Sequence, residues 1–157
     1  MGKAVSDEVG RTTFYTDEIS RATGTLEPAA DAFNAKHYGA VPRGIEVETV
    51  TLDQLLAEGW SRPFVMKIDV EGAELRVLRG GREFFSKQPP ILLLEIFNDR
   101  PQAFALLNEV GYKCFDSDRR TGVVPETTNV LALPPELCDD AADALAALGY
   151  RIATRPL

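Results

Sequence analysis

The chain has 157 residues, of which 45% are hydrophobic, so it is long enough for one globular domain with a sizeable core. Its 17 Lys and Arg against 24 Asp and Glu give a formal net charge of −7. This acidic balance, without a basic cluster, argues against binding to nucleic-acid phosphates or to an anionic membrane surface.

Cysteine content and hydropathy indicate the cellular compartment in which we expect the chain. Cys114 and Cys138 are too few for a disulfide framework and lack the spacing of a metal site. No apolar run approaches the roughly 18 residues of a membrane span. The N-terminus has no basic-then-apolar signal pattern. These features predict a cytoplasmic chain with no metal, no nucleic-acid partner and no membrane contact.

The N-terminal residues predict strands before any helix. Residues 3–6 and 11–15 are β-prone and flank a turn, so we expect them to form a hairpin. Residues 16–44 are less determined, although a proline favours a short helix at 29–36. Because substrate choice tends to reside on loops, we expect this region to border the substrate.

A strand and a capped helix follow. Residues 45–50 alternate apolar and polar side chains, which indicates a strand with one buried face. Thr51 is a suitable N-cap for a helix over 51–56, because Gln54 stands three residues later as in a capping box.

The stretch Phe64–Glu74 holds the densest chemistry of the chain. Residues 64–69 alternate in the manner of a strand, and 72–79 are expected to form a helix that Gly80-Gly81 ends. An apolar strand that turns polar at its carboxyl end and then opens a helix is typical of an α/β ligand crevice. For Glu71 and Glu74 the alternative role is structural, since negative charge stabilises the first turn of a helix.

Lys67 and Glu95 form a possible pair. Lys67 is unusual in a central parallel strand, which commonly has two apolar faces. The apolar run 91–97 predicts a strand covered on both faces, with Glu95 near its end and Asn98 just beyond. If the two strands are parallel neighbours, Lys67 and Glu95 can pair and fix the register. A direct contact of Glu95 with substrate is the other possibility.

The next elements predict an antiparallel end to the sheet. Residues 101–110 have helical spacing of apolar side chains, and strands are expected at 112–116 and 128–133. The link between these two strands is too short for a helix, so the pair is expected to be antiparallel.

The C-terminal residues are expected to form a separate unit. Residues 135–148 predict one amphipathic helix with Leu137, Ala141, Leu145 and Leu148 on its apolar stripe. We therefore divide the chain into a main domain, residues 1–134, and a C-terminal helix with a short tail packed on it, residues 135–157.

Several segments together resemble the FkbM-type family of S-adenosylmethionine-dependent methyltransferases. The matching residues are Val50–Leu56, Lys67–Glu74 and Pro90–Ile96, with Leu78–Gly81 and the opening Ala4–Asp7 to Phe14-Tyr15 in support. The run Lys-Ile-Asp-Val-Glu-Gly-Ala-Glu between a strand and a helix is the most specific of these. The resemblance covers about residues 3 to 134.

This resemblance implies an α/β fold. The expected architecture is a partial doubly wound, Rossmann-like class I methyltransferase, in which the sheet is mostly parallel and the C-terminal strand is antiparallel. It implies S-adenosylmethionine as the cofactor, and methyl transfer to a hydroxyl oxygen of a small molecule or sugar. Asp69 is the first candidate for the general base and Glu71 the second. Lys67, Glu95 and Asn98 are candidates for substrate binding or for structural pairing.

The family also implies a donor-binding half with a Gly-rich loop and a ribose-binding acid, neither of which stands in this sequence. We therefore expect an N-terminally truncated domain whose donor-binding residues are unknown. We also expect a free sheet edge at residues 64–69, covered by self-association or by a partner. The alternative function is a non-catalytic remnant, or a binding and association module with the same half-fold.

Overall fold

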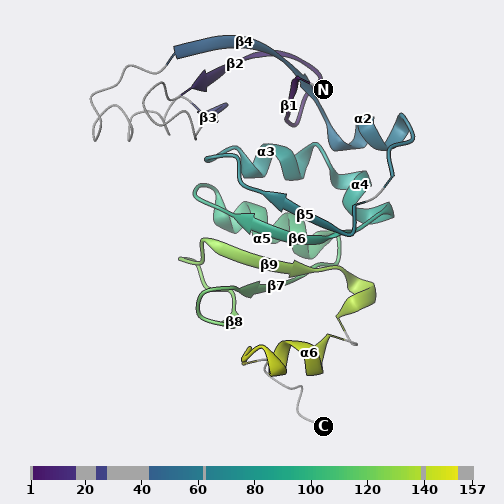
Figure 1. The fold of residues 1–157 in the computed structure, drawn as a ribbon, viewed down its shortest axis with the longest axis vertical. Coiled ribbons are helices and arrows are strands. Elements are labelled where there is room, and N and C mark those ends of the chain that lie inside the picture. The colour runs from purple at the N-terminus through teal and green to yellow at the C-terminus, as the bar shows by residue number, and fades with distance from the viewer. Residues whose placement is uncertain (1, 17–23, 28–42, 62, 139–140, 152–157) are drawn as a thin grey trace.

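A computed structural model describes residues 2–16, 24–27, 43–61, 63–138 and 141–151 (Figure 1). The described strands form two sheets, one of four strands and one of five. The four-stranded sheet contains β1 (Lys3–Val5), β2 (Gly10–Thr16), β3 (Gly24–Thr25) and β4 (Arg43–Val50). The five-stranded sheet contains β5 (Val65–Ile68), β6 (Ile91–Glu95), β7 (Lys113–Asp116), β8 (Thr121–Gly122) and β9 (Asn129–Leu133).

The four-stranded sheet has the order β1-β4-β2-β3. The predicted pairing of the first two strands is wrong, because β4 lies between them, parallel to β1 and antiparallel to β2. The long strand β4 offers hydrogen-bonding groups along both of its edges, so each short strand pairs with it. The helix predicted at 29–36 lies outside the described residues.

The five-stranded sheet has the order β5-β6-β9-β7-β8. β5 and β6 are parallel, and β9 is antiparallel to both β6 and β7, as predicted for the return strand. The expectation of a mostly parallel sheet is wrong. Because β9 inserts between β6 and β7 and β8 folds back on β7, most neighbouring pairs are antiparallel, and the fold is a mixed α/β fold.

The helices are short and several begin or end as the sequence predicts. The described helices are α2 (Leu52–Ala57), α3 (Glu74–Arg79), α4 (Arg82–Lys87), α5 (Arg100–Glu109), the 3-10 helix η1 (Pro135–Leu137) and α6 (Ala142–Ala147). Thr51 caps α2 by accepting a hydrogen bond from the Gln54 amide, 3.0 Å away, which confirms the predicted cap. Gly80 ends α3, and α4 ends just before Pro89.

The C-terminal helix is shorter than predicted. Residues 135–137 form a 3-10 turn that begins at the second of two successive prolines, and the regular helix α6 begins only at Ala142. Leu145 is buried, as expected, but Leu148 is 62% exposed. Gly149, with a φ of +84°, follows directly, so the apolar stripe does not extend to Leu148.

The core lies on one face of the five-stranded sheet, where α3, α4 and α5 pack against it (Figure 1). Alternate residues of the central strands point to this face. The Tyr112 hydroxyl, buried in this core, donates a hydrogen bond to the Pro90 carbonyl at 2.8 Å. The buried residues at its centre include Ile68, Leu78, Phe85, Leu92, Leu94, Leu107, Val130 and Ala132.

The opposite face of this sheet is only partly covered. Phe115, Leu133 and Leu145 form a small second core where α6 packs near β7 and β9. Towards β5 this face is open: Val65 is 46% exposed and Leu93 is 42% exposed. The prediction that residues 91–97 are covered on both faces is therefore wrong for the face that carries Leu93.

Strand β5 stands at the edge of its sheet and, within the described residues, pairs only with β6. No other described strand covers the outer edge of β5, in line with the free edge expected at residues 64–69, and Phe64 beside it is 71% exposed. Within the described residues neither Cys114 nor Cys138 forms a disulfide. No helix in the described part of the chain has the length and apolarity needed to cross a bilayer.

Candidate functional site

Polar side chains gather where β5 and β6 end. Lys67 is opposite Leu93 in the parallel register, and Glu95 is opposite Asn129. Since alternate residues share a face, Lys67, Glu95 and Asn129 lie on the same, partly open face, and Asp69 continues β5 towards the same edge. The carboxyl ends of β5 and β6 therefore present two carboxylates along one edge of the sheet, and the start of β9 adds the Asn129 amide.

The turn after β5 has an unusual backbone. Glu71 has a φ of +53° and Gly72 a φ of +101°, both in the left-handed region. Gly72 adopts this conformation freely, whereas for Glu71 it costs about 1–3 kcal/mol. Such strain persists only where surrounding contacts maintain it, and it is concentrated at functional sites.

Glu74 stabilises this turn from the start of α3. Its side chain is completely buried, and Oε1 accepts a hydrogen bond from the Gly72 amide at 2.8 Å. The other oxygen, Oε2, is buried without a hydrogen-bond partner. Glu74 also opens the helix, where its charge suits the helix dipole, so the structure supports a structural role for this glutamate.

A second support comes from the four-stranded sheet. The Thr25 hydroxyl donates a hydrogen bond to the Glu71 carbonyl at 2.8 Å and accepts one from the Glu27 amide at 2.9 Å. The Glu27 carboxylate pairs with Arg76 of α3 at 3.0 Å. Sequence reasoning missed Thr25, because no local pattern predicts a contact between residues 46 positions apart.

Lys67 pairs within its own strand. Its ammonium lies 2.7 Å from Asp69 Oδ2, and the Lys67 side chain is 65% exposed. This hydrogen bond, followed by the charges of Asp69, Glu95 and Glu71, raises the pKa of Lys67. The direct ion pair is therefore with Asp69, while Glu95 acts on Lys67 only through its charge.

The surroundings of Glu71 raise the pKa of its carboxyl group. Partial burial raises its pKa, and the negative charges of Asp69, Glu95 and Glu74 raise it further. Lys67 opposes the effect by lowering it. A carboxylate whose pKa is raised in this way accepts a proton more readily at neutral pH than an ordinary surface glutamate.

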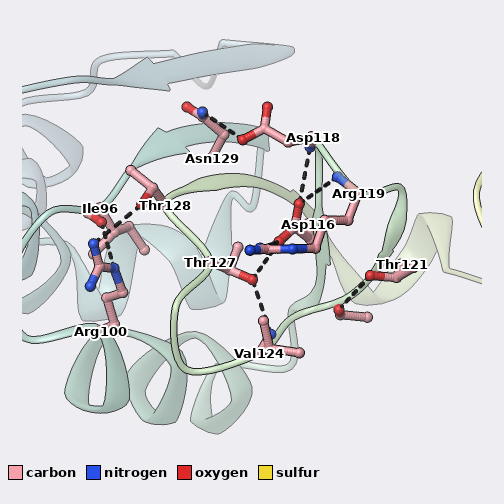
Figure 2. A network of polar contacts seen from close by, with 11 residues as sticks. Ile96, Arg100, Asp116, Asp118, Arg119, Thr121, Val124, Thr127, Thr128 and Asn129 are labelled. Atoms are coloured by element: carbon pink, nitrogen blue, oxygen red, sulfur yellow. Dashed lines mark hydrogen bonds and ion pairs between the residues drawn. The ribbon is translucent and has the colours of Figure 1, made fainter.

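The sequence motif did not reveal a second polar network at the same edge (Figure 2). Asp116, at the end of β7, is 1% exposed and accepts hydrogen bonds from the Asp118 and Arg119 amides, the Arg119 guanidinium and the Thr127 hydroxyl. These bonds outweigh burial, which alone would raise the pKa of Asp116, and lower it to about 2. The network holds the turn between β7 and β8.

Three further hydrogen bonds in Figure 2 lie at this edge. Asn129 Nδ2 donates to Asp118 Oδ2 at 2.9 Å, which links the start of β9 to the turn after β7. Arg100 donates to the Ile96 carbonyl at 3.0 Å and to the Thr128 hydroxyl at 3.2 Å. The predicted site residue Asn98 is exposed in the turn between β6 and α5.

The chain matches the family model described as Methyltransferase FkbM domain over residues 3–152. The chain belongs to the FkbM methyltransferase family. The match confirms the family inferred from the motif, and it extends beyond residue 134 into the C-terminal helix. The searches of curated proteins and of solved structures found no significant match.

A methyltransferase of this family implies a donor such as S-adenosylmethionine, and the described residues do not fit its cradle. Such a cradle needs free backbone amides on a Gly-rich turn between a strand and a helix. The turn after β5 has that position, but its Gly72 amide is already bonded to Glu74. Among the described residues no group of three or more His, Cys, Asp or Glu side chains could hold a metal ion.

Proposed function

We propose that this chain carries the acceptor side of an S-adenosylmethionine-dependent methyltransferase that modifies a hydroxyl oxygen of a small molecule or sugar. Membership of the FkbM family supports the reaction class. Three polar side chains lie in a row on one partly open face, those of Asp69, Glu95 and Asn129. This row supports an acceptor with several hydroxyl groups, because a carboxylate accepts hydrogen bonds from hydroxyl groups and an amide both accepts and donates them.

Glu71 is the proposed general base. The observation that carries this assignment is its raised pKa in a strained turn beside Asp69 and Glu95. Asp69, the first candidate from the sequence, is engaged with Lys67, which leaves it better suited to orient the acceptor. In this assignment the acceptor hydroxyl gives its proton to the Glu71 carboxylate as the oxygen becomes the nucleophile.

A transfer assay tests the proposal. The chain is incubated with S-adenosylmethionine labelled in its methyl group and with a panel of sugars and hydroxylated small molecules. Because general-base catalysis contributes roughly 10²–10⁴-fold, Glu71→Gln should lower transfer by at least about 10²-fold. Glu109→Gln, a matched change at an exposed glutamate of α5, should leave it unchanged. Measurable transfer at equal rates by Glu71→Gln and the wild-type chain would remove Glu71 from the reaction.

The donor cradle is proposed to come from a polypeptide segment that covers the free edge of β5. An unpaired edge strand offers its backbone groups to another strand, and Phe64 and Val65 add exposed apolar surface beside it. A segment of the same protein outside the described residues, a second copy or another chain can supply it. The same edge supports the alternative function, a non-catalytic association module.

Sedimentation and calorimetry separate the two functions. If the edge associates, Phe64→Glu should lower the sedimentation coefficient at high protein concentration, whereas Val9→Glu, at an equally exposed site in the turn before β2, should not. Donor binding measured by titration calorimetry in the associated form supports the enzyme. Association without any heat of donor binding supports the association module. Micromolar donor binding by a monomer would contradict the proposed incomplete cradle.

A further inference from the structure

Residues 24–27 of the four-stranded sheet meet the turn that carries Glu71. We propose that Thr25 is a positioning residue for Glu71: its hydroxyl holds the Glu71 carbonyl and thereby maintains the left-handed turn that places the Glu71 carboxylate beside Asp69 and Glu95. The inference rests on the proposed function, in which Glu71 is the base, and it assigns to the four-stranded sheet a direct part in the site.

The hydroxyl of Thr25 is fully used and shielded from water. It donates to the Glu71 carbonyl at 2.8 Å and accepts from the Glu27 amide at 2.9 Å. Thr25 is 4% exposed, so bulk water has little access to replace the bond if the hydroxyl is removed. A valine at this position has nearly the same shape but cannot donate to the carbonyl.

The bond acts on the part of the backbone that is strained. The carbonyl of Glu71 belongs to the peptide unit that links it to Gly72, so fixing this oxygen fixes the turn at the two residues with positive φ. Glu74 holds the amide of the same peptide unit from the other side, at 2.8 Å. The carbonyl of this peptide unit is therefore held by Thr25 of the four-stranded sheet, and its amide by Glu74 of α3.

The support behind Thr25 is firm. An added Cβ at Gly24 would lie 2.3 Å from Phe14 Cζ and 3.2 Å from the Tyr15 carbonyl oxygen, so β3 packs closely on β2 and the Phe14 ring would have to move to admit a side chain. The ion pair of Glu27 with Arg76 ties the same segment to α3. Because these contacts fix Thr25, its hydroxyl can hold the turn in a fixed position relative to the four-stranded sheet.

Carbon-13 NMR of the backbone carbonyl and the side-chain carboxyl of Glu71 tests the inference. In Thr25→Val the carbonyl resonance of Glu71 should shift, and the pKa of its carboxyl should fall towards the ordinary glutamate value. This fall is expected because a relaxed turn lets the carboxylate move into solvent and away from Asp69, Glu95 and Glu74, with Lys67 still exposed nearby. Thr25→Ser keeps the hydroxyl and should preserve both wild-type values.

Controls separate positioning from general loss of structure. Thr16→Val removes another hydroxyl-to-carbonyl bond of the same sheet, to Arg43 at 3.2 Å, and should change neither value. Thr25→Ala serves as a second variant without the hydroxyl if Thr25→Val does not fold. A wild-type carbonyl resonance and carboxyl pKa in either variant would overturn the inference.

The two readouts also distinguish the inference from the proposed function. An ordinary pKa for Glu71 in the wild-type chain would contradict its role as the base, whatever Thr25 does. The carbonyl resonance, compared between the variants at one fixed pH at which Glu71 is ionised in all of them, would still decide whether Thr25 holds the turn. In the transfer assay, Thr25→Val should lower kcat more than it raises KM, and Thr25→Ser should restore kcat.

Discussion

Replacing Asp116 with asparagine should destabilise the fold by about 2 kcal/mol at neutral pH. Asparagine has nearly the same shape, and its carbonyl can still accept from the Asp118 and Arg119 amides. In the wild-type chain the Arg119 guanidinium and the Thr127 hydroxyl each donate to Asp116 Oδ2 at 2.6 Å. In the variant these two groups would face the amide nitrogen of asparagine. The substitution therefore removes a buried charged acceptor and leaves an amide donor facing these two donors.

The magnitude follows from the ionisation of Asp116. A pKa lowered from 3.8 to about 2 corresponds to about 2.4 kcal/mol, at 1.36 kcal/mol per pKa unit. Asp116 is buried, but the Arg119 side chain is 56% exposed, so solvent screens part of their attraction. Allowing for this screening, we expect about 1.5–2 kcal/mol from the charge.

The lowered pKa of Asp116 determines how its stabilising effect changes with pH. The stabilisation is fully present above 3.8, the value in the unfolded chain, and it is lost as the pH falls through about 2. The difference in the free energy of unfolding between the wild-type chain and Asp116→Asn should therefore be constant near neutral pH. It should decrease steadily between pH 4 and pH 2.

Urea unfolding followed by circular dichroism measures this difference at a series of pH values. Asp118→Asn is the matched control in the same turn, since Asp118 bonds Asn129 at the surface and should change stability by less than about 0.5 kcal/mol. A difference for Asp116→Asn that stays constant from pH 7 to pH 2 would refute the reasoning. So would an Asp116→Asn chain as stable as the wild type at pH 7.

Three other substitutions have expected costs that urea unfolding at pH 7 can check. Gly72→Ala should cost about 1–3 kcal/mol, because a φ of +101° strains any residue with a Cβ; an unchanged midpoint would contradict the left-handed turn. Tyr112→Phe should cost about 1–3 kcal/mol, because it leaves the buried Pro90 carbonyl without its hydroxyl donor, and a cost below about 0.5 would show that water replaces it. Leu78→Ala, at a position with no exposed surface, should cost about 2–5 kcal/mol, and a smaller value would mean that the core collapses around it.

Local patterns in the sequence predicted most of the elements. The Thr51 cap, the strands at β5, β6, β7 and β9 and the helix end at Gly80 follow from local chemistry. The antiparallel return of β9 follows from a link too short for a helix. Such features depend on residues close in the sequence, and so a single sequence reveals them.

Strand order could not be predicted in the same way. The turn between β1 and β2 suggested a hairpin, but β4, roughly 40 residues later, pairs with both strands. The open face at Leu93 depends on how far α6 reaches over the sheet, which the pattern of residues 135–148 overestimated. These outcomes depend on competition between distant partners for the same backbone groups.

The site was predicted in composition but not in arrangement. Asp69 and Glu71 were identified from the motif, yet only the structure shows that Lys67 engages Asp69 and that Glu71 occupies a left-handed turn. Thr25 lacked any sequence signal, because its contact with Glu71 depends on how the two sheets meet.

The pH dependence of methyl transfer tests the central claim, that Glu71 is the base of the site, most directly. With an acceptor from the panel, kcat/KM should rise with pH through an apparent pKa above the ordinary glutamate value, because the free carboxylate is the active form. This rise should vanish in Glu71→Gln. A profile that keeps the same rise in Glu71→Gln would contradict the account.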